Sequence, residues 1–295
     1  MPNENNNRMI PGFAVYHDRN GSMGEACRCL EHHQVIFFLS GEGSYVVEGK
    51  TYRLQPGDLL LTSDREIHRD GEKTGARHDR YIAYIDSAFF EEAKRLDYNS
   101  EDLSRCFQVL SNRRHHLLRL EDQERKRVAV IFSALAQTNS PAAYGSDMLK
   151  KCYMVELLIH LNRACFSGQG TEGEAVRYNQ KIQEIVEFIN ANLDQELSLD
   201  WISQRFDVSK YHLTREFKRY LGLSLHQYIL KKRLLNARGA LRQGQTAAQA
   251  FTLSGFSDYS HFSRAFRESF GMSPREYRIR AKEGPFPMTE LFRET

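Results

Sequence analysis

The sequence predicts an α+β fold. An N-terminal antiparallel β-barrel is followed by helices and then by an all-α C-terminal domain, in which a linker helix joins two helix-turn-helix units. Three observations predict this architecture. Short β-rich runs fill the first 86 residues, apolar residues then recur at helical spacing, and the C-terminal third contains an internal repeat.

The length and composition indicate a globular protein of at least two domains. The 295 residues exceed what one hydrophobic core usually organises, and the hydrophobic fraction of 41% and charged fraction of 27% are typical of globular proteins. No apolar run approaches the ~20 residues that span a bilayer. The polar N-terminus also lacks the pattern of a secretory signal. We therefore expect a cytoplasmic protein with no membrane partner.

The five cysteines are expected to be reduced thiols. Their number is odd, and they form no C-x-x-C pair for zinc or redox chemistry. They are Cys27, Cys29, Cys106, Cys152 and Cys165.

Charge is distributed unevenly along the chain. The net charge is +3, but residues 181–283 contain 17 Lys and Arg against 11 Asp and Glu. This basic segment suggests a polyanionic partner for the C-terminal domain, of which nucleic acid is the most common.

The first domain is expected over residues 1–86. Short strands are predicted at residues 35–39, 45–47, 52–54 and 59–62, because these β-rich runs alternate with turns that contain Gly or Pro. Consecutive hairpins of this kind fit a small antiparallel barrel.

The middle of the chain predicts helices and then a linker. From residue 87 to 166 the pattern is helical, and one apolar stripe suggests either internal packing or a dimer interface. The stripe consists of Cys152, Val155, Leu158, Ile159 and Leu161. A Gly-rich polar stretch predicts a flexible linker over residues 167–178. The second domain then covers residues 179–283, and a tail covers 284–295.

A repeat with an offset of 49 residues is the strongest signal in the chain. The matching pairs are Leu213 and Phe262, Arg215 and Arg264, Phe217 and Phe266, Gly222 and Gly271, Ser224 and Ser273, and Tyr228 and Tyr277. Each copy therefore predicts one helix-turn-helix unit. In the first copy Ser209 is expected to cap the second helix, whose Leu213 and Phe217 face inward and which Gly222 ends. In the second copy the turn falls at residues 255–257.

The outward face of the second helix in each copy carries the candidate DNA contacts. They are Tyr211, Thr214 and Arg215 in the first copy, and Tyr259, Ser260, Ser263 and Arg264 in the second. Arginine binds the O6 and N7 atoms of guanine with two hydrogen bonds, which contribute about 1–3 kcal/mol of discrimination. If only one copy were present, these residues could equally form an ordinary solvated helix face. The presence of two copies in register disfavours that alternative.

A helix between the copies is expected to set their spacing. Ser224 can cap a helix that runs to about Leu241, which spans roughly 25 Å. Recognition helices on one face of DNA lie ~34 Å apart, which this helix and the domain widths can reach. The basic residues 231–233 either contact phosphate or only solubilise the helix.

The C-terminal segment resembles a known family. Residues 255–258 (GFSD) and 271–278 (GMSPREYR), with the repeat residues between them, resemble the signature of the AraC/XylS regulators, and residues 208–218 match the same pattern. The resemblance covers roughly residues 181–281. It implies a bacterial transcription regulator that binds double-stranded DNA, with base contacts at the seven positions named above. Tyr259 and Ser260 stand where some relatives have long amide side chains.

Residues 30–70 resemble the cupin-like sensor of the same family through residues 41–43, residues 56–58 and His68. This resemblance implies a small-molecule effector in the barrel, pairing of subunits through the following helices, and contact with RNA polymerase. Catalytic cupins hold a metal with two His and one Glu on a strand. Here the strand offers His32, His33 and Gln34, and adjacent histidines point to opposite faces. We therefore expect no metal, no cofactor and no enzyme.

His33 and His68 are the candidate effector contacts, with a structural role as the alternative for His68. Two other function classes stay open. One is a metal-dependent cupin enzyme joined to a DNA-binding module, which requires bound metal and turnover by residues 1–166. The other is an architectural DNA protein without base preference, which the Arg and Tyr residues on the reading faces disfavour.

Overall fold

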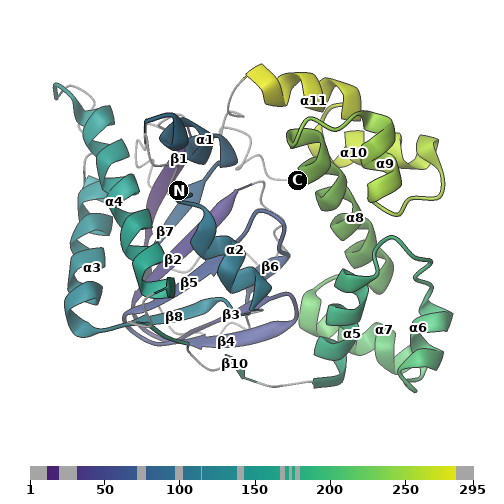
Figure 1. Cartoon of the computed structure of the whole chain (residues 1–295). Coiled ribbons are helices and arrows are strands. Elements are labelled where there is room, and N and C mark those ends of the chain that lie inside the picture. Colours follow the sequence, from purple (N-terminus) through teal and green to yellow (C-terminus); the bar gives the residue numbers. More distant parts are fainter. Residues whose placement is uncertain are drawn as a thin grey trace, which may run out of the picture.

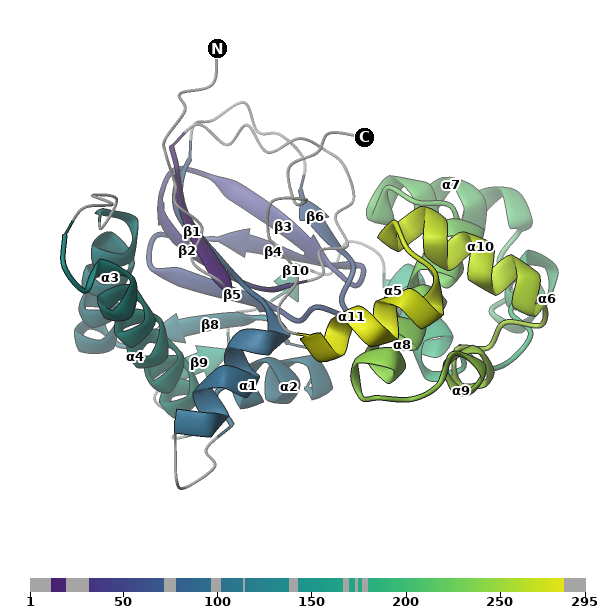
Figure 2. The same ribbon diagram turned by 90° about the horizontal axis from the view of Figure 1, so that it is seen from above.

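The computed structural model contains a β-sheet domain and a helical domain in contact with each other (Figure 1). It describes residues 12–19, 32–71, 78–96, 102–113, 115–137, 143–166, 170–172, 175–176 and 180–283. In both views the two sheets lie between a pair of long helices, α3 and α4, and the helical C-terminal domain (Figure 2). The predictions for residues 1–11, for Cys27 and Cys29 and for the tail 284–295 lie outside the described residues.

Two antiparallel sheets form the N-terminal domain, as predicted. The larger sheet contains, in spatial order, β1 (Phe13–Asp18), β7 (Asp79–Ile85), β2 (His33–Ser40), β5 (Asp58–Thr62), β8 (Leu117–Leu120) and β9 (Gly170–Glu172). The smaller sheet contains β10 (Ala175–Val176), β4 (Lys50–Leu54), β3 (Gly43–Val47) and β6 (His68–Asp70).

The alternation of side chains along each strand separates two apolar cores. On β2, Val35 and Phe37 pack against the helices that cover the larger sheet. Ile36 and Phe38 point the other way and pack with side chains of the smaller sheet. Because both faces of β2 are covered, its sequence is a continuous apolar run.

Four helices cover the outer face of the larger sheet. They are α1 (Ser87–Leu96), α2 (Arg105–Asn112), α3 (Asp122–Gln137) and α4 (Ser146–Phe166). The stripe predicted on α4 belongs partly to this core, because Leu158 and Leu161 are fully buried while Cys152 is exposed. None of the helices in the described ranges has the length and apolar character needed to cross a bilayer.

The segment expected to be helical or flexible between residues 87 and 178 also contributes strands. β8 pairs with β5, β9 pairs with β8, and β10 pairs with β4. Strands of two to four residues that add to the edge of a sheet need little apolar pattern of their own, so a Gly-rich composition does not reveal them. The expectation of a continuous flexible linker at 167–178 is therefore corrected for residues 170–172 and 175–176.

The C-terminal domain consists of seven helices over the described residues 180–283. They are α5 (Gln180–Ala191), α6 (Leu199–Arg205), α7 (Lys210–Leu221), α8 (Leu225–Arg242), α9 (Ala247–Leu253), α10 (Tyr259–Phe270) and α11 (Pro274–Glu283). Each helix-turn-helix unit has its own apolar core, and α8 contributes to both. Tyr228 of α8 packs in the first core, and Leu234 and Leu241 pack in the second. The two units are therefore joined through one continuous helix.

Capping residues define the boundaries of both second helices, at the predicted Ser209 and Gly222 and at the corresponding positions of the second copy. The side chain of Ser209 accepts a hydrogen bond from the N–H of His212, and Asp258 does the same for α10. Gly222 and Gly271 end these helices in the left-handed region, with φ of 73° and 72°. The repeat thus specifies the same start and stop for α7 and α10.

Gly255 allows the two units to come close to each other. Its φ is +76°, and an added Cβ would overlap the carbonyl oxygen of Leu193 in the first unit. We predict that Gly255→Ala lowers the free energy of unfolding by about 2 kcal/mol more than Gly271→Ala, measured by urea denaturation. Gly271 is the matched control, because its φ is +72° and its added Cβ would meet no described atom within 4 Å. Equal losses in the two variants would contradict a steric role for Gly255.

Candidate DNA interface and effector site

Helix α7 presents the first predicted reading face. Leu213 and Phe217 are fully buried, which fixes the rotation of the helix about its axis. Tyr211, Thr214 and Arg215 are consequently exposed, and 75% of the Tyr211 surface is open to solvent.

The local contacts of α7 orient its arginine. The Nε atom of Arg215 lies 3.1 Å from a carboxylate oxygen of Glu216, and its guanidinium carbon lies 5.9 Å from the centroid of the Tyr211 ring. Thr214 donates from its hydroxyl to the carbonyl oxygen of Lys210 at 2.8 Å. The guanidinium is thus held beside the tyrosine by a charged hydrogen bond.

Helix α10 presents the second face in the same register. Phe262 and Phe266 are fully buried, and Tyr259, Ser260 and Arg264 are exposed, with Ser263 half-buried between them. The Tyr259 ring packs edge-on against Phe262, which holds it at the start of the helix. Arg264 has no acidic neighbour equivalent to Glu216, since Ala265 follows it. The two arginines therefore differ in how firmly the protein orients them.

The structure places all seven predicted contact residues on two exposed helix faces. By the offset of 49 residues, Tyr211, Thr214 and Arg215 correspond to Ser260, Ser263 and Arg264. The N-terminal domain covers none of the seven, because each retains solvent exposure. Both faces are therefore open to a partner in this arrangement of the domains.

Two of the three basic residues at 231–233 form hydrogen bonds within the protein instead. Lys232 is buried and donates to Glu48 at 3.0 Å and to the carbonyl oxygen of Arg65 at 2.8 Å. Arg233 donates to two carbonyl oxygens of the connection between α5 and α6. Neither of the two expected roles, phosphate contact or solubilising the helix, therefore applies to Lys232 and Arg233. Their partners are far away in the sequence and are visible only in the folded structure.

Glu48 connects the two domains. It lies at the tip of the β3–β4 hairpin, where Glu48 and Gly49 both have positive φ, 48° and 79°. Its side chain is 13% exposed and accepts four hydrogen bonds. The donors are the backbone N–H of Ile67 (2.6 Å), Asn190 Nδ2 (2.6 Å), Lys232 Nζ (3.0 Å) and the Tyr228 hydroxyl. Three of these donors belong to the C-terminal domain.

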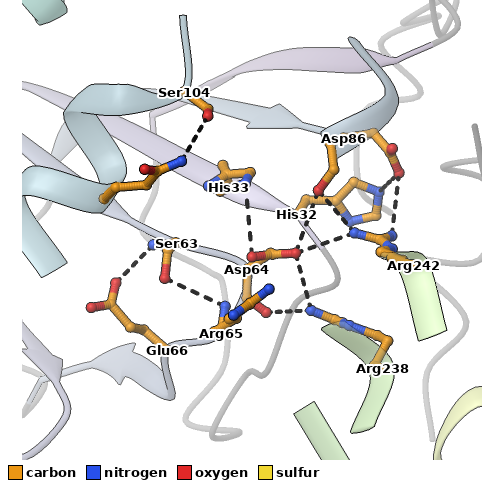
Figure 3. A network of polar contacts seen from close by, with 12 residues as sticks. His32, His33, Ser63, Asp64, Arg65, Glu66, Asp86, Ser104, Arg238 and Arg242 are labelled. Atoms are coloured by element: carbon orange, nitrogen blue, oxygen red, sulfur yellow. Dashed lines mark hydrogen bonds and ion pairs between the residues drawn. The ribbon is translucent and has the colours of Figure 1, made fainter. Parts of the chain in front are cut away.

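Asp64 forms a second charged contact with α8. Figure 3 shows Arg238 and Arg242 of α8 directed toward its carboxylate, at 3.4 Å and 3.2 Å from Oδ2. Burial would raise the pKa of Asp64, but its basic neighbours His33, Arg238 and Arg242 outweigh burial and lower it. The ionised carboxylate therefore binds α8 at neutral pH.

A third contact involves the end of α7. Arg69 of β6 donates to the carbonyl oxygens of Arg219 and Tyr220, at 3.0 Å and 2.9 Å. These carbonyls lie in the last turn of the helix, where they have no partner within the helix and where a cation is favourable. One recognition helix is thus attached directly to the β-domain.

The two candidate effector residues lie on opposite sides of the larger sheet. His33 faces the helices, where its ring contacts Phe90 and Phe107 and its Nε2 lies 3.7 Å from Asp64. His68 lies between the sheets, beside Val47, which pairs with it across the ladder. They therefore do not form one site.

The interior of the barrel is polar around His68. Its ring stacks on Tyr45, whose hydroxyl donates to Gln34 at 3.0 Å. The Nδ1 atom lies 3.1 Å from the carbonyl oxygen of Glu66, and Nε2 is buried without a hydrogen-bond partner among the described residues. Burial lowers the pKa of His68 to about 4, so the ring is neutral at pH 7. Gln34 thus has a hydrogen-bonding role inside the barrel that its position beside His33 on the strand did not reveal.

The described residues contain no cluster of three His, Cys, Asp or Glu side chains that could hold a metal ion. Cys106, Cys152 and Cys165 form no disulfide bond within the described residues, as expected for reduced thiols.

Comparisons with known proteins match both halves of the chain. Residues 12–158 match the family described as AraC-like ligand binding domain, and residues 202–280 match a helix-turn-helix domain family. The chain belongs to the AraC family of transcription regulators. Its N-terminal domain is a ligand-binding domain of this family, and its C-terminal domain binds DNA through the helix-turn-helix units.

Individual AraC-family relatives are distant in sequence. The transcriptional activator RhaS of Pectobacterium atrosepticum is 27% identical over 259 residues, which cover 84% of this chain and 85% of RhaS. The regulator GbdR of Pseudomonas aeruginosa is 39% identical over 99 residues, which cover 33% of this chain and 27% of GbdR. The structure of ToxT from Vibrio cholerae matches with a TM-score of 0.36 and 13% identity, covering 91% of this chain and 98% of ToxT.

The buried neutral His68 predicts a loss of stability in mild acid. Its pKa is about 4 in the folded regulator, whereas an unburied histidine has a pKa of 6.5, so the unfolded chain binds the additional proton. The contribution of neutral His68 to the free energy of unfolding is present above about pH 6.5 and is lost as the pH falls toward 4. When the pH is lowered from about 7 to about 5.5, the unfolding free energy of the parent chain should therefore fall by about 1 kcal/mol more than that of the His68→Gln variant. Urea titrations at each pH measure this difference.

The matched control for His68→Gln is the same substitution at the exposed His226 of α8. A pH dependence that is identical in the His68 variant and the parent chain would contradict a neutral buried His68.

Proposed function

We propose that this regulator reads two adjacent major-groove segments of double-stranded DNA with α7 and α10, under the control of a small-molecule effector. The observation that carries the proposal is the pair of exposed faces in register, each opposite a fully buried aromatic core. Recognition helices place their N-terminal residues against base edges, and the seven candidate residues occupy that part of both helices.

The connection between the two units supports simultaneous binding. Helix α8 contains 18 residues, which corresponds to a length of about 27 Å. It is rigid because both unit cores pack on it. Successive major grooves on one face of DNA are ~34 Å apart, and the widths of the two units add to the helix length.

The proposed contacts divide by chemistry. Arg215 and Arg264 bind guanine edges, because a guanidinium matches O6 and N7 bidentately. The hydroxyl residues bind phosphates or other base edges and fix the register of the protein on the duplex. They are Tyr211, Thr214, Tyr259, Ser260 and Ser263.

For the effector, we propose contacts in the N-terminal domain. The Nε2 atom of His68 supports this, because a buried nitrogen without a partner can accept a hydrogen bond from a ligand hydroxyl. His33 is assigned to the domain interface, since its partner Asp64 binds α8. A ligand that favours one arrangement of the domains then changes DNA binding.

The regulator is further proposed to act in the cytoplasm as a transcription activator that contacts RNA polymerase and lacks enzymatic activity. The name of the RhaS relative, a transcriptional activator, supports this role. Pairing of two subunits is proposed through α3 and α4, where Val130, Met148 and Leu149 are exposed. The buried part of the predicted stripe, Leu158 and Leu161, serves internal packing instead.

Selection of binding sequences from a random duplex pool tests the reading faces. We predict two short motifs about one helical turn apart, one relaxed by Arg215→Ala and the other by Arg264→Ala. Each substitution should weaken binding to the selected duplex about ten- to hundredfold, because each removes about 1–3 kcal/mol of base recognition.

Arg127→Ala on α3 is the control, since this exposed arginine lies outside both faces. Enrichment of no sequence would contradict sequence-specific binding, and unchanged motifs in both variants would exclude Arg215 and Arg264 as base contacts.

A further inference from the structure

The two recognition helices differ in the residues that surround their arginines. By the offset of 49 residues, Glu216 of α7 corresponds to Ala265 of α10, and Tyr211 corresponds to Ser260. The first unit therefore offers its arginine a carboxylate and an aromatic ring, whereas the second offers a methyl group and a hydroxyl. Both helices begin at a capping side chain and end at a left-handed glycine. The difference thus lies beside the residue that is proposed to read guanine.

Glu216 is held in place by the core of the first unit. It follows the fully buried Leu213 by three positions and precedes the fully buried Phe217, so it lies at the edge of the inward face of α7. Its side chain is 8% exposed, and its Oε1 atom lies 3.1 Å from the Nε atom of Arg215. A carboxylate that is removed from water requires a charged or hydrogen-bonding partner. The burial of Glu216 therefore favours this position of the Arg215 guanidinium.

The contact with Glu216 leaves the outer edge of Arg215 available. A guanidinium has five N–H donors, of which Nε carries one and the two Nη atoms carry four. Because Glu216 accepts from Nε, the Nη donors remain for the O6 and N7 atoms of guanine. The Arg215 side chain is 58% exposed, and the Tyr211 ring flanks its guanidinium carbon at 5.9 Å. The carboxylate and the ring thus restrict the orientation of the guanidinium without covering its donors.

Arg264 of the second unit lacks both supports. Within the part of the chain that the structure describes, no hydrogen bond, ion pair or ring contact involves its guanidinium. Ala265 is buried in the core of the second unit and has no polar atom in its side chain. Arg264 must therefore lose more conformational freedom than Arg215 when it binds a base.

We propose that Glu216 is a positioning residue for Arg215 and makes the first unit the more guanine-selective of the two. The inference rests on the proposed reading of DNA by α7 and α10. A positioned guanidinium loses little entropy when it binds guanine, and it cannot easily turn toward a phosphate or another base when guanine is absent. Arg264 is free to make that turn. The guanine read through Arg215 should therefore be distinguished more strongly than the guanine read through Arg264.

Binding of the full chain to duplexes that differ in one atom tests this role. In the selected duplex, 7-deazaguanine replaces the guanine that depends on Arg215 or, in a second duplex, the guanine that depends on Arg264. This base retains Watson–Crick pairing but lacks the N7 acceptor. The readout is the discrimination ratio, the Kd for the 7-deazaguanine duplex divided by the Kd for the parent duplex, measured by fluorescence anisotropy.

In the parent chain we expect a larger discrimination ratio at the Arg215-dependent guanine than at the Arg264-dependent guanine. Glu216→Ala should lower the first ratio about two- to tenfold, because Arg215 is then ordered only on binding. The second ratio should not change. Equal ratios in the parent chain, a first ratio that is unchanged in Glu216→Ala, or an equal fall in both ratios would overturn the proposal.

Two further variants separate positioning from charge and from folding. Glu216→Gln retains the side-chain volume and an oxygen acceptor for Nε, so it should lower the first ratio less than Glu216→Ala does. Glu268→Ala removes an equal charge from an exposed position of α10 and should leave both ratios unchanged. Urea denaturation identifies the variants that are folded, and the Gln variant carries the comparison with the parent chain if the Ala variant is unstable.

A double-mutant cycle shows whether Glu216 acts through Arg215. In an Arg215→Ala background, Glu216→Ala should alter the affinity for the parent duplex no more than Glu268→Ala does. A merely structural role for Glu216 would instead weaken binding by the same factor in both backgrounds. Guanine reading that depends on Arg215 but not on Glu216 refutes the positioning role alone. The absence of a selected duplex refutes the proposed function.

Discussion

The hydrogen-bonded ion pair between Glu48 and Lys232 is the contact on which the arrangement of the two domains depends. A carboxylate with 13% exposure is costly unless it is paired and hydrogen-bonded, and only the docked domains supply Asn190, Tyr228 and Lys232 together. Glu48 is also held at positive φ in its hairpin, an uncommon conformation for a residue other than glycine. Backbone geometry and charge thus both direct this side chain at α8.

Helix α8 has two structural roles in this chain. It packs in the cores of both helix-turn-helix units, and it carries Lys232, Arg238 and Arg242 to the acidic residues of the N-terminal domain. Any change in how the ligand-binding domain holds α8 therefore acts on both reading faces at once. Arg69 adds a direct contact with the end of α7. The ligand-binding domain thus contacts both α8 and α7 directly.

Local sequence rules predicted the DNA-binding half closely, because capping residues, glycines and apolar spacing fix each helix from nearby residues. Ser209 and Gly222 begin and end α7 as predicted, and Gly271, the repeat partner of Gly222, ends α10 in the same way. The interdomain contacts could not be predicted, because Glu48 and Lys232 are 184 residues apart and exposed charges look the same in sequence as buried ones. The short strands β9 and β10 were hidden for a similar reason, since their partners lie far away along the chain.

Hydroxyl-radical footprinting on a selected duplex tests the central claim most directly, that two recognition helices fixed by α8 bind DNA together. We expect two protected stretches on one face of the duplex, with centres about one helical turn, ~34 Å, apart. The spacing should be the same on every selected sequence, because a single rigid helix sets it. A single protected stretch, or two stretches whose separation varies between sequences, would contradict simultaneous binding by two helices at a fixed spacing.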